Sequence, residues 1–552
     1  MEKTNIFVNL IMKKLFLFLV LFGLFCQSCR QGAEKSVKTV FKYNEAANIT
    51  SLDPAFARDQ AIIWATNQLF NGLIQLDDRL IIRPCIARSW EISEDGKIYT
   101  FHLRRDVSFH PSPAFPGSQG RIVVANDFVY SFNRLIDPKL ASPGAWIFDN
   151  VKNKNGKYEF QAPNDSTLKI ELKQPFPPFL GLLSTQYCSV VPAEVVRFYG
   201  PGFRNHPIGT GPFLFKMWKE GVKLVLLKNP NYFEMEKGFR LPYLDAVDIT
   251  FLPDKQSAFL EFMKGNLDFM SGIDPTYKDE VLTPEGELQN KYHSKISLIS
   301  QPYLNTEYLG FMLDGANLSG NTQGVINKRI RQAINYAFDR HKMIRYLRNN
   351  IGTPGEQGIT PKGLPSFDSS MTFFSYDPEK AAKLLAEAGF PGGKGMPVIT
   401  LTSTSDYLDI CKYIQHQVSK LGINLEIEIS PPAAVKEMKA QAKLPFFRAS
   451  WIADYPDAEN YLSLFYSKNF CPRGPNYSHF SNPEFDLLYE KAMLIVNDSI
   501  RYSLYQKMEQ ILMSEAPVVI LYYDQVLRFV QKNVTGLGNN PMNLLTLKRV
   551  KK

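Results

Sequence analysis

The chain has 552 residues, of which 45% are hydrophobic and 21% are charged. A single hydrophobic core stops growing at about 250–300 residues, so this length predicts two or more lobes, and the ordinary apolar fraction excludes a disordered polymer. The 63 Lys and Arg residues exceed the 54 Asp and Glu residues by 9, an excess too small for this length to indicate a nucleic-acid-binding protein.

Residues 1–28 are typical of a secretory signal peptide. Lys13 and Lys14 precede an apolar run at 15–25, which gives the basic start and short apolar core of such a segment. The run is shorter than the roughly 20 apolar residues that a membrane-spanning helix needs. Either Met12 is the true start, or the basic region extends back to Met1. Without residues 1–28, the chain keeps 60 basic and 53 acidic residues, a net charge of +7.

The end of this segment reads Cys26-Gln27-Ser28-Cys29 and has two interpretations. A Cys-x-x-Cys spacing can form a redox pair. Its position behind an apolar core instead resembles the cleavage site of bacterial lipoproteins, with cleavage after Ser28 and lipid on Cys29. That resemblance implies an exported protein, lipid-anchored to the cell membrane or the outer membrane and facing the periplasm or the exterior, with residues 29–39 as a tether.

The absence of catalytic motifs favours a binding protein. The sequence contains no His-Glu-x-x-His, no Gly-x-Ser-x-Gly and no Gly-Lys-Ser/Thr phosphate loop, which are the local signatures of common hydrolases and nucleotide-binding enzymes. We therefore expect no catalytic residues, no metal and no cofactor.

An exported chain permits one or two disulfides, but the spacing does not pair the four candidates, Cys85, Cys188, Cys411 and Cys471.

The first half of the chain alternates between helical and extended patterns. Apolar residues recur at helical spacing in some segments and at every second position in others, and Pro or Gly separates them. The patterns predict, in order, a strand and turn at 48–54, a helix within 58–73, a strand at 97–103, a helix at 127–135 and a strand at 168–172.

Two glycines between two prolines mark a tight turn at Pro207-Ile208-Gly209-Thr210-Gly211-Pro212. Such glycines can cradle a phosphate, or they can form a structural turn where the chain crosses between lobes. We favour the structural turn because no helix start and no Lys follows it. Residues 223–227 and 247–251 are rich in strand-forming residues and predict strands after the turn.

The second half predicts an α/β lobe over residues 300–520. The predicted elements are a helix over 328–345, a helix opened by Asp377-Pro378-Glu379 and closed by Gly389, a strand–helix–strand unit from 400–404 to 424–429, a helix starting at 481–484 and a buried strand at 518–523.

Several short motifs follow one another in an order that resembles a known family. They are Ser51-Leu52-Asp53-Pro54, Leu69-Phe70-Asn71-Gly72-Leu73, Ala87-Arg88-Ser89-Trp90 with His102-Leu103-Arg104, Pro207 to Phe213, Lys228-Asn229-Pro230-Asn231-Tyr232, Ile330 to Ala337 and Tyr376 to Ala381. Over about residues 40–545 the chain is similar to bacterial extracellular solute-binding proteins of family 5, the peptide-binding class that serves ABC transporters.

The resemblance implies an α/β, two-lobed periplasmic-binding-protein clamp of the class II type with an additional α+β subdomain. It implies a monomer that binds a peptide between its lobes and delivers it to the permease subunits of an ABC transporter. The expected boundaries are 40–75 for the first part of lobe I, 76–205 for the peripheral subdomain, 206–300 for lobe I continued, 301–520 for the ligand-binding lobe II and 521–552 for the return to lobe I.

The expected ligand-binding segment runs from Arg448 to Asp457. By its resemblance to oligopeptide- and dipeptide-binding proteins, Asp454 binds the α-ammonium of the peptide; the alternative is a turn residue before Pro456, a role that suits Asp457 better. Trp451 either walls the pocket or belongs to the core. Arg448 either reaches the carboxylate end of some peptides or pairs with a carboxylate of the protein.

One loop departs from the family pattern, and the ligand class stays open. His110 to Gly117 form a longer, proline-rich loop, in which His110 is either a metal ligand or, as we favour, a structural residue. Relatives that bind nickel, sugar and haem share this fold, so the fold does not assign a peptide. The alternatives are a binder of a non-peptide solute, such as an oligosaccharide or a metal chelate, and an exported hydrolase.

Overall fold

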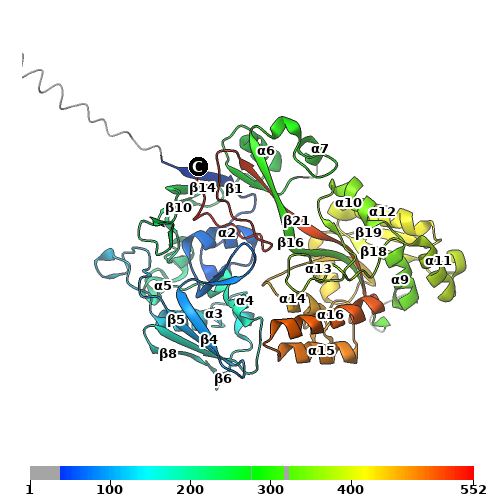
Figure 1. Cartoon of the computed structure of the whole chain (residues 1–552), viewed down its shortest axis with the longest axis horizontal. Coiled ribbons are helices and arrows are strands. Elements are labelled where there is room, and N and C mark those ends of the chain that lie inside the picture. The colour runs from blue at the N-terminus through cyan, green and yellow to red at the C-terminus, as the bar shows by residue number, and fades with distance from the viewer. Residues whose placement is uncertain (1–37, 275–276, 316–322) are drawn as a thin grey trace, which may run out of the picture. The chain divides into compact units, whose positions relative to one another are not determined.

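The computed structural model describes residues 38–274, 277–315 and 323–552, and Val40–Lys552 form one compact unit. The expected signal peptide at 1–28, the expected lipidation site Cys29 and most of the expected tether lie outside the described residues. The unit is built around an 11-stranded mixed sheet with the strand order β10-β11-β14-β1-β15-β21-β16-β20-β18-β19, to which β17 adds beside β21 (Figure 1). The α/β fold class predicted from the sequence is confirmed.

Lobe I is the half of this sheet that contains β1, and three separate parts of the chain contribute to it, the last being the C-terminal residues. β1 pairs in parallel with both β14 and β15, and Trp64 of helix α2 packs against Tyr43 and Phe269 at ring centroid distances of 6.2 and 5.8 Å. The elements are β1 (Val40–Asn44), α2 (Gln60–Leu69), β10 (Phe213–Lys219), β11 (Lys223–Lys228), β14 (Ala246–Thr250), α6 (Lys255–Met263), β15 (Phe269–Ser271) and α7 (Lys278–Val281), with the hairpin β12 (Met235–Glu236) and β13 (Phe239–Arg240).

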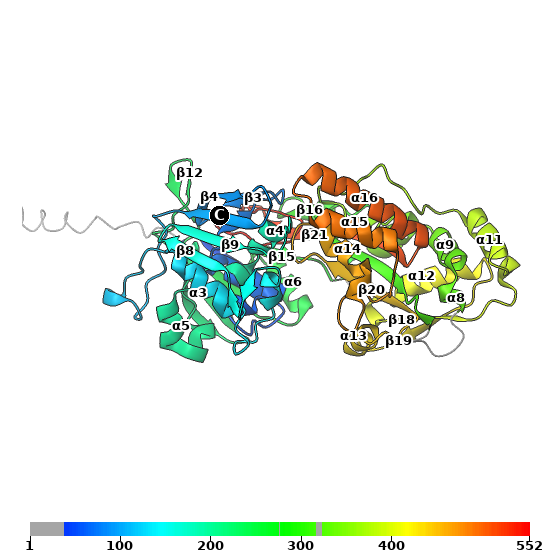
Figure 2. The ribbon, with the colours of Figure 1, turned by 90° about the horizontal axis from the view of Figure 1, so that it is seen from below.

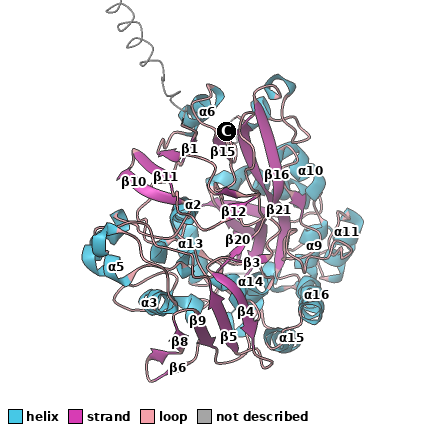
Figure 3. Ribbon diagram, turned by 60° about the vertical axis from the view of Figure 1, so that its left-hand side comes forward, coloured by secondary structure: helices cyan, strands magenta, loops and turns pink. Residues whose placement is uncertain are grey.

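The peripheral subdomain is a four-stranded antiparallel sheet, β4-β5-β9-β8, that is separate from the large sheet (Figure 3). Its core is aromatic: Phe148 lies 4.7 Å from Phe132 and 5.0 Å from Phe160 between ring centroids. The elements are β2 (Ile74–Leu76), β3 (Ile82–Pro84), β4 (Ala87–Ile92), β5 (Ile98–Leu103), α3 (Ala125–Leu135), β6 (Asn153–Lys154), β7 (Lys157–Tyr158), β8 (Phe160–Asn164), β9 (Thr167–Glu171), α4 (Phe179–Leu183) and α5 (Ala193–Tyr199).

Lobe II is the other half of the large sheet, and helices cover both of its faces. Successive strand residues point to opposite faces, so Leu309 packs in one core with α9 to α12 while Tyr308 packs in another with α15 and α16. The elements are α8 (Gln323–Ile326), α9 (Lys328–Tyr336), α10 (Arg340–Arg348), β17 (Thr353–Pro354), α11 (Pro378–Glu387), β18 (Ile399–Ser403), α12 (Leu408–Ser419), β19 (Leu425–Ile429), α13 (Pro432–Ala440), β20 (Phe446–Ile452), α14 (Glu459–Leu462), α15 (Pro483–Met493) and α16 (Asp498–Glu515).

Two long antiparallel strands, β16 (Ile296–Phe311) and β21 (Val518–Gln531), join the two halves (Figure 2). One end of β21 pairs with β15 of lobe I, and the far end of β16 pairs with β20 of lobe II. The register between them shifts twice, between Pro302 and Thr306 and between Glu307 and Tyr308. These strands, and not the turn at Pro207–Phe213, form the crossing between lobes, so that part of the prediction is wrong. The boundaries assigned from the sequence stay predictions.

The turn at 207–212 is structural, as favoured, and it packs on the end of α2. A Cβ added to Gly209 would overlap the carbonyl oxygen of Leu69 and the ring of Phe70. The backbone N–H of His110 donates to Gly209 O at 2.7 Å, and His110 Nε2 donates to Gly211 O at 2.9 Å. The glycines are therefore needed for close contact between chain segments.

Gly209→Ala is expected to destabilise the protein by about 1–3 kcal/mol, because the methyl group would overlap backbone that cannot rotate away. Urea unfolding measures the change. Gly202→Ala is the matched control, since the nearest atom to its added Cβ lies 4.0 Å away. Equal stability of the two variants would contradict the packing role of Gly209.

Three predicted elements differ from the structure. Residues 48–53 form no strand before the turn. The helix expected over 328–345 is two helices, because Asp339 begins α10 by accepting a hydrogen bond from Lys342 N at 2.9 Å. The strand expected at 518–523 continues to Gln531, because β15 and β16 pair with its second half.

Local signals at the other helix ends are confirmed. The Asp377 side chain accepts from Lys380 N at 2.9 Å, Pro378 is the first residue of α11, and Gly389 follows the helix with a φ of +91°. The predicted strand–helix–strand unit is the parallel pair β18 and β19 joined by α12.

All four cysteines of the described part, Cys85, Cys188, Cys411 and Cys471, are free and buried, so none of them forms a disulfide. Across the described residues, no helix has both the length and the apolar character that crossing a membrane requires.

Candidate ligand-binding site between the lobes

Asp454 lies just beyond the end of β20, where the chain leaves the sheet. Ile452 is the last residue of β20 paired with β16, opposite Asn305, and Ala453 N then donates to Leu304 O at 2.9 Å. Asp457 turns the chain into α14 by accepting from Glu459 N at 2.9 Å. The turn role assigned to Asp457 therefore agrees with the structure, and Asp454 is left at the strand end.

A cavity of about 350 Å³ opens at this strand end, and both lobes contribute its walls. Lobe I provides the turn before α2 and the start of that helix, lobe II provides Tyr303 and the end of β20, and the subdomain adds Trp146 and Tyr187. The other lining residues are 76, 184–186 and 542–544. The cavity is thus placed between lobes and has aromatic walls, as expected for a small-molecule site.

The carboxylate of Asp454 has no ion pair with a described residue. Solvent reaches it through the cavity, yet protein surrounds it closely enough that desolvation raises the pKa of Asp454, while a side-chain hydrogen bond with Asn460 acts in the opposite direction. Because its charged form is destabilised by burial, Asp454 would gain more from a bound cation than a carboxylate in bulk water does.

Asn460 fixes the backbone beside this carboxylate, and no sequence signal identified it. Its Oδ1 accepts from Trp451 Nε1 at 2.7 Å and from Asp454 N at 3.3 Å. Trp451 packs against the lobe II core and is not among the residues that line the cavity. Of its two interpretations, the core residue fits the structure, with a hydrogen bond that supports the site indirectly.

Arg448 pairs with a carboxylate of the protein, which is one of the two interpretations left open. Its Nη2 donates to Glu307, and its guanidinium lies 3.5 Å from the centre of the Tyr407 ring. Asn305 Nδ2 links Glu307, at 3.1 Å, to Asp524, at 3.4 Å. The charge of Arg448 is therefore compensated before any ligand arrives.

A buried acidic group lies behind Asp454. Glu459 accepts hydrogen bonds from the hydroxyls of Tyr455 and Tyr489, and burial raises its pKa to about 7. Beside it, Asp457 accepts from Arg501 Nη2 at 3.1 Å and from Tyr505 Oη at 2.8 Å. No sequence pattern marks Glu459 as special, because Tyr489 comes from α15, 30 residues later in the chain.

The residues that follow Asp454 contact the peripheral subdomain. A Cβ on Gly181 of the subdomain would lie 3.5 Å from both Tyr455 Cβ and Pro456 Cδ. The rings of Trp146 and Tyr455 lie 6.3 Å apart between centroids, and Phe176 packs against the cores of both lobes. Ligand-facing and lobe-contacting residues are thus consecutive in the chain.

His110 is a structural residue. It is buried, and burial lowers its pKa to about 4, so the ring is neutral near pH 7. Across residues 38–274, 277–315 and 323–552, no group of three or more His, Cys, Asp or Glu side chains could hold a metal ion.

Comparison with known proteins gives the same family along most of the chain. Residues 82–470 match the family described as "Bacterial extracellular solute-binding proteins, family 5 Middle". The chain is 28% identical to heme-binding protein A of Haemophilus influenzae, covering 92% of this chain and 91% of that protein. It is 27% identical to the periplasmic oligopeptide-binding protein OppA of Salmonella typhimurium, covering 94% and 93%.

Solved structures show the same fold. The periplasmic binding protein DppA from Helicobacter pylori, in complex with the peptide STSA, superposes with a TM-score of 0.72 at 25% identity, covering 93% of this chain and 97% of that one. HbpA2 from Haemophilus parasuis superposes with a TM-score of 0.79 at 22% identity, covering 93% and 99%. The predicted two-lobed clamp is therefore confirmed.

Proposed function

Because the chain belongs to the bacterial extracellular solute-binding proteins of family 5, we propose that it captures peptides in the cavity between its lobes and delivers them to the permease of an ABC transporter. The observation that carries the proposal is the unpaired carboxylate of Asp454 at the wall of that cavity. A peptide ammonium is the cation that it would bind, through a charge-assisted hydrogen bond.

Closure of the lobes would complete the site. Water expelled from the cavity strengthens the interaction between the ammonium and Asp454, because the effective dielectric constant falls. A ligand that touches both walls favours the closed arrangement and shifts the equilibrium towards it. Side-chain selectivity would come from the aromatic walls, and bridging waters would allow varied side chains at little cost.

The proposal includes export and anchoring. Residues 1–28 would be removed, and lipid on Cys29 would keep the protein at a membrane face close to its permease. The basis for this step is the sequence pattern alone, since these residues lie outside the described part. The family's role is binding, and the proposal includes no chemical conversion of the ligand.

A thermal-shift experiment tests the proposal. A mixture of di- to pentapeptides should stabilise the purified protein by about 2.7 kcal/mol at a hundredfold excess over Kd. Recovery of the peptides unchanged after long incubation would exclude a hydrolase. Stabilisation by an oligosaccharide, haem or a metal chelate, but not by peptides, would replace the peptide with a different solute.

A further inference from the structure

A second unpaired charge faces the same cavity as Asp454, on the opposite wall. Arg58 belongs to the turn before α2, where its backbone N–H donates to Phe56 O at 2.8 Å. Its side chain is exposed, lines the cavity and makes no hydrogen bond or ion pair with a described residue. The next residue, Asp59, uses its carboxylate to begin α2 by accepting from Ile62 N at 3.2 Å.

Within the described part of the chain, the other cationic side chains along this cleft have partners. Three further cavities form a series with the cavity at Asp454, because neighbouring cavities share wall residues. Ser184 and Gln60 each join one cavity to the cavity at Asp454, and Gly272 joins the second of these to the last. Their Lys and Arg side chains all contact a carboxylate of the protein. The pairs are Arg83–Asp77, Lys255–Asp274, Lys278–Asp279, Arg348–Asp524, Lys548–Glu234 and Arg549–Glu236.

Arg448 is also unavailable to a ligand anion, because Glu307 already compensates its charge. An anion that displaced Glu307 would leave that carboxylate buried without a partner, which is unfavourable. Binding an anion at Arg58 has no such cost, because Arg58 has no partner among the described residues to lose.

Both unpaired charges, Asp454 and Arg58, affect the pKa of the same side chain, Tyr187. Its ring lines the cavity, and its pKa is raised to about 12, mainly by burial. The charge of Asp454 raises this pKa further, and the charge of Arg58 lowers it. Both walls are therefore within electrostatic reach of one phenol hydroxyl, although Asp454 and Arg58 form no ion pair with each other.

We propose that Arg58 binds the carboxylate end of the peptide whose ammonium lies on Asp454, so that the cavity selects short peptides with both termini charged. This inference rests on the proposed function and specifies its ligand. A cavity of about 350 Å³ lies within the usual range of small-ligand sites, which suits a peptide of a few residues held at both ends.

Titration calorimetry with trialanine and its C-terminal amide tests the inference. Amidation removes the carboxylate and keeps the ammonium. Because a hydrogen bond to a charged group contributes about ten- to a hundredfold to an equilibrium constant, amidation should weaken binding to the wild-type protein by that factor. The Arg58→Gln variant should bind trialanine more weakly than the wild-type protein does, by a similar factor. This variant should bind trialanine and its C-terminal amide with almost equal affinity.

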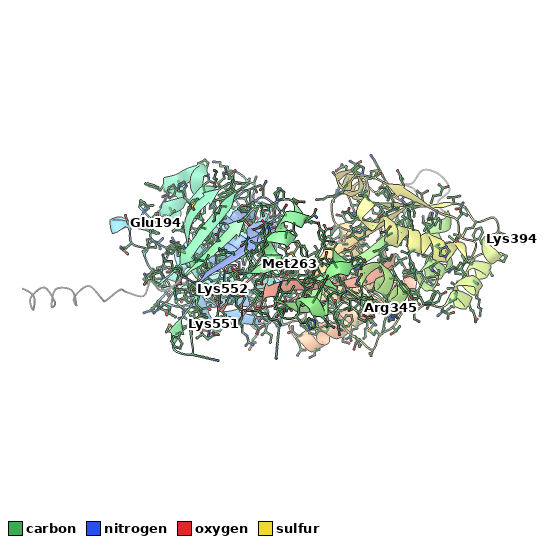
Figure 4. All side chains as sticks on the ribbon, turned by 90° about the horizontal axis from the view of Figure 1, so that it is seen from above. Glu194, Met263, Arg345, Lys394, Lys551 and Lys552 are labelled. Carbon is green, nitrogen blue, oxygen red and sulfur yellow. The ribbon has the colours of Figure 1, made fainter. Side chains whose placement is uncertain are left out.

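Arg345→Gln is the matched control. Arg345 is exposed on α10, makes no hydrogen bond or ion pair with a described residue and does not line the cavity. Figure 4 labels it in the lobe II half, apart from Lys552 of lobe I. This variant should discriminate acid from amide as the wild-type protein does.

Three results would overturn the inference while the proposed function stands. The first is equal binding of trialanine and its amide by the wild-type protein. The second is binding of pentaalanine, or of the peptide mixture, without any binding of trialanine. If Arg58→Gln still discriminates acid from amide by the full factor, the carboxylate is bound elsewhere and the inference is wrong. If no peptide stabilises the protein, the proposed function itself fails.

Discussion

Asp454→Asn is expected to weaken binding of a peptide with a free amino terminus by several hundredfold or more, yet to change binding of the same peptide very little once its terminus is acetylated. Removing one member of a buried charge pair costs about 3–5 kcal/mol. Acetylation removes the cation and the substitution removes the carboxylate, so either change alone eliminates the same interaction. The two effects should therefore not add.

Calorimetry on the four combinations of protein and peptide gives the coupling energy. Asp406→Asn is the matched control: Asp406 is an exposed carboxylate of lobe II that does not line the cavity, and its loss should leave both peptides unaffected. A misfolded variant would lose both ligands together. If the wild-type protein binds acetylated and free peptides equally well, Asp454 is only a turn residue and the ammonium site is wrong.

Glu459→Gln is expected to remove a large pH dependence of stability. Burial raises the pKa of Glu459 from 4.5 to about 7, so between these values the folded protein holds a proton that the unfolded chain releases. The stabilising contribution is thus complete below pH 4.5 and is lost as the pH rises through 7. At about 1.36 kcal/mol per pKa unit, the loss amounts to about 3 kcal/mol.

Urea unfolding at pH 4 and pH 8 measures this effect as a difference between proteins. The free energy of unfolding of the wild-type protein should fall by about 3 kcal/mol more over this range than that of Glu459→Gln. Glu484→Gln, at an exposed position of α15, should follow the wild-type protein. Parallel pH profiles for wild type and Glu459→Gln would show that Glu459 titrates at an ordinary value.

Elements set by local signals could be predicted from the sequence. Asp377 and Pro378 begin α11 as expected, because cap and first-turn preferences act within a few residues. The break between α9 and α10 had such a signal too, in Asp339, but the continuous apolar stripe across 330–344 concealed it. The full length of β21 could not be predicted, since pairing with β15 and β16 extends it.

Only some residues of the candidate site could be predicted from the sequence. Asp454 was identified through its motif, and the structure places it at the cavity wall. The partner of Arg448 is Glu307, 141 residues earlier in the chain, and no spacing rule connects the two positions. Arg58 follows one of the recognised motifs, but its lack of a partner appears only once the neighbouring residues are placed in space.

The adjacency of Asp454 to Tyr455 and Pro456 constrains how this site could change during evolution. A substitution that moved the carboxylate would also disturb the contact with Gly181 of the subdomain, and so would alter recognition and closure together. Arg58 lies on an exposed turn with no such second duty. Divergence of ligand preference is therefore expected to begin at the lobe I wall, where one residue can be exchanged without cost to the motion of the clamp.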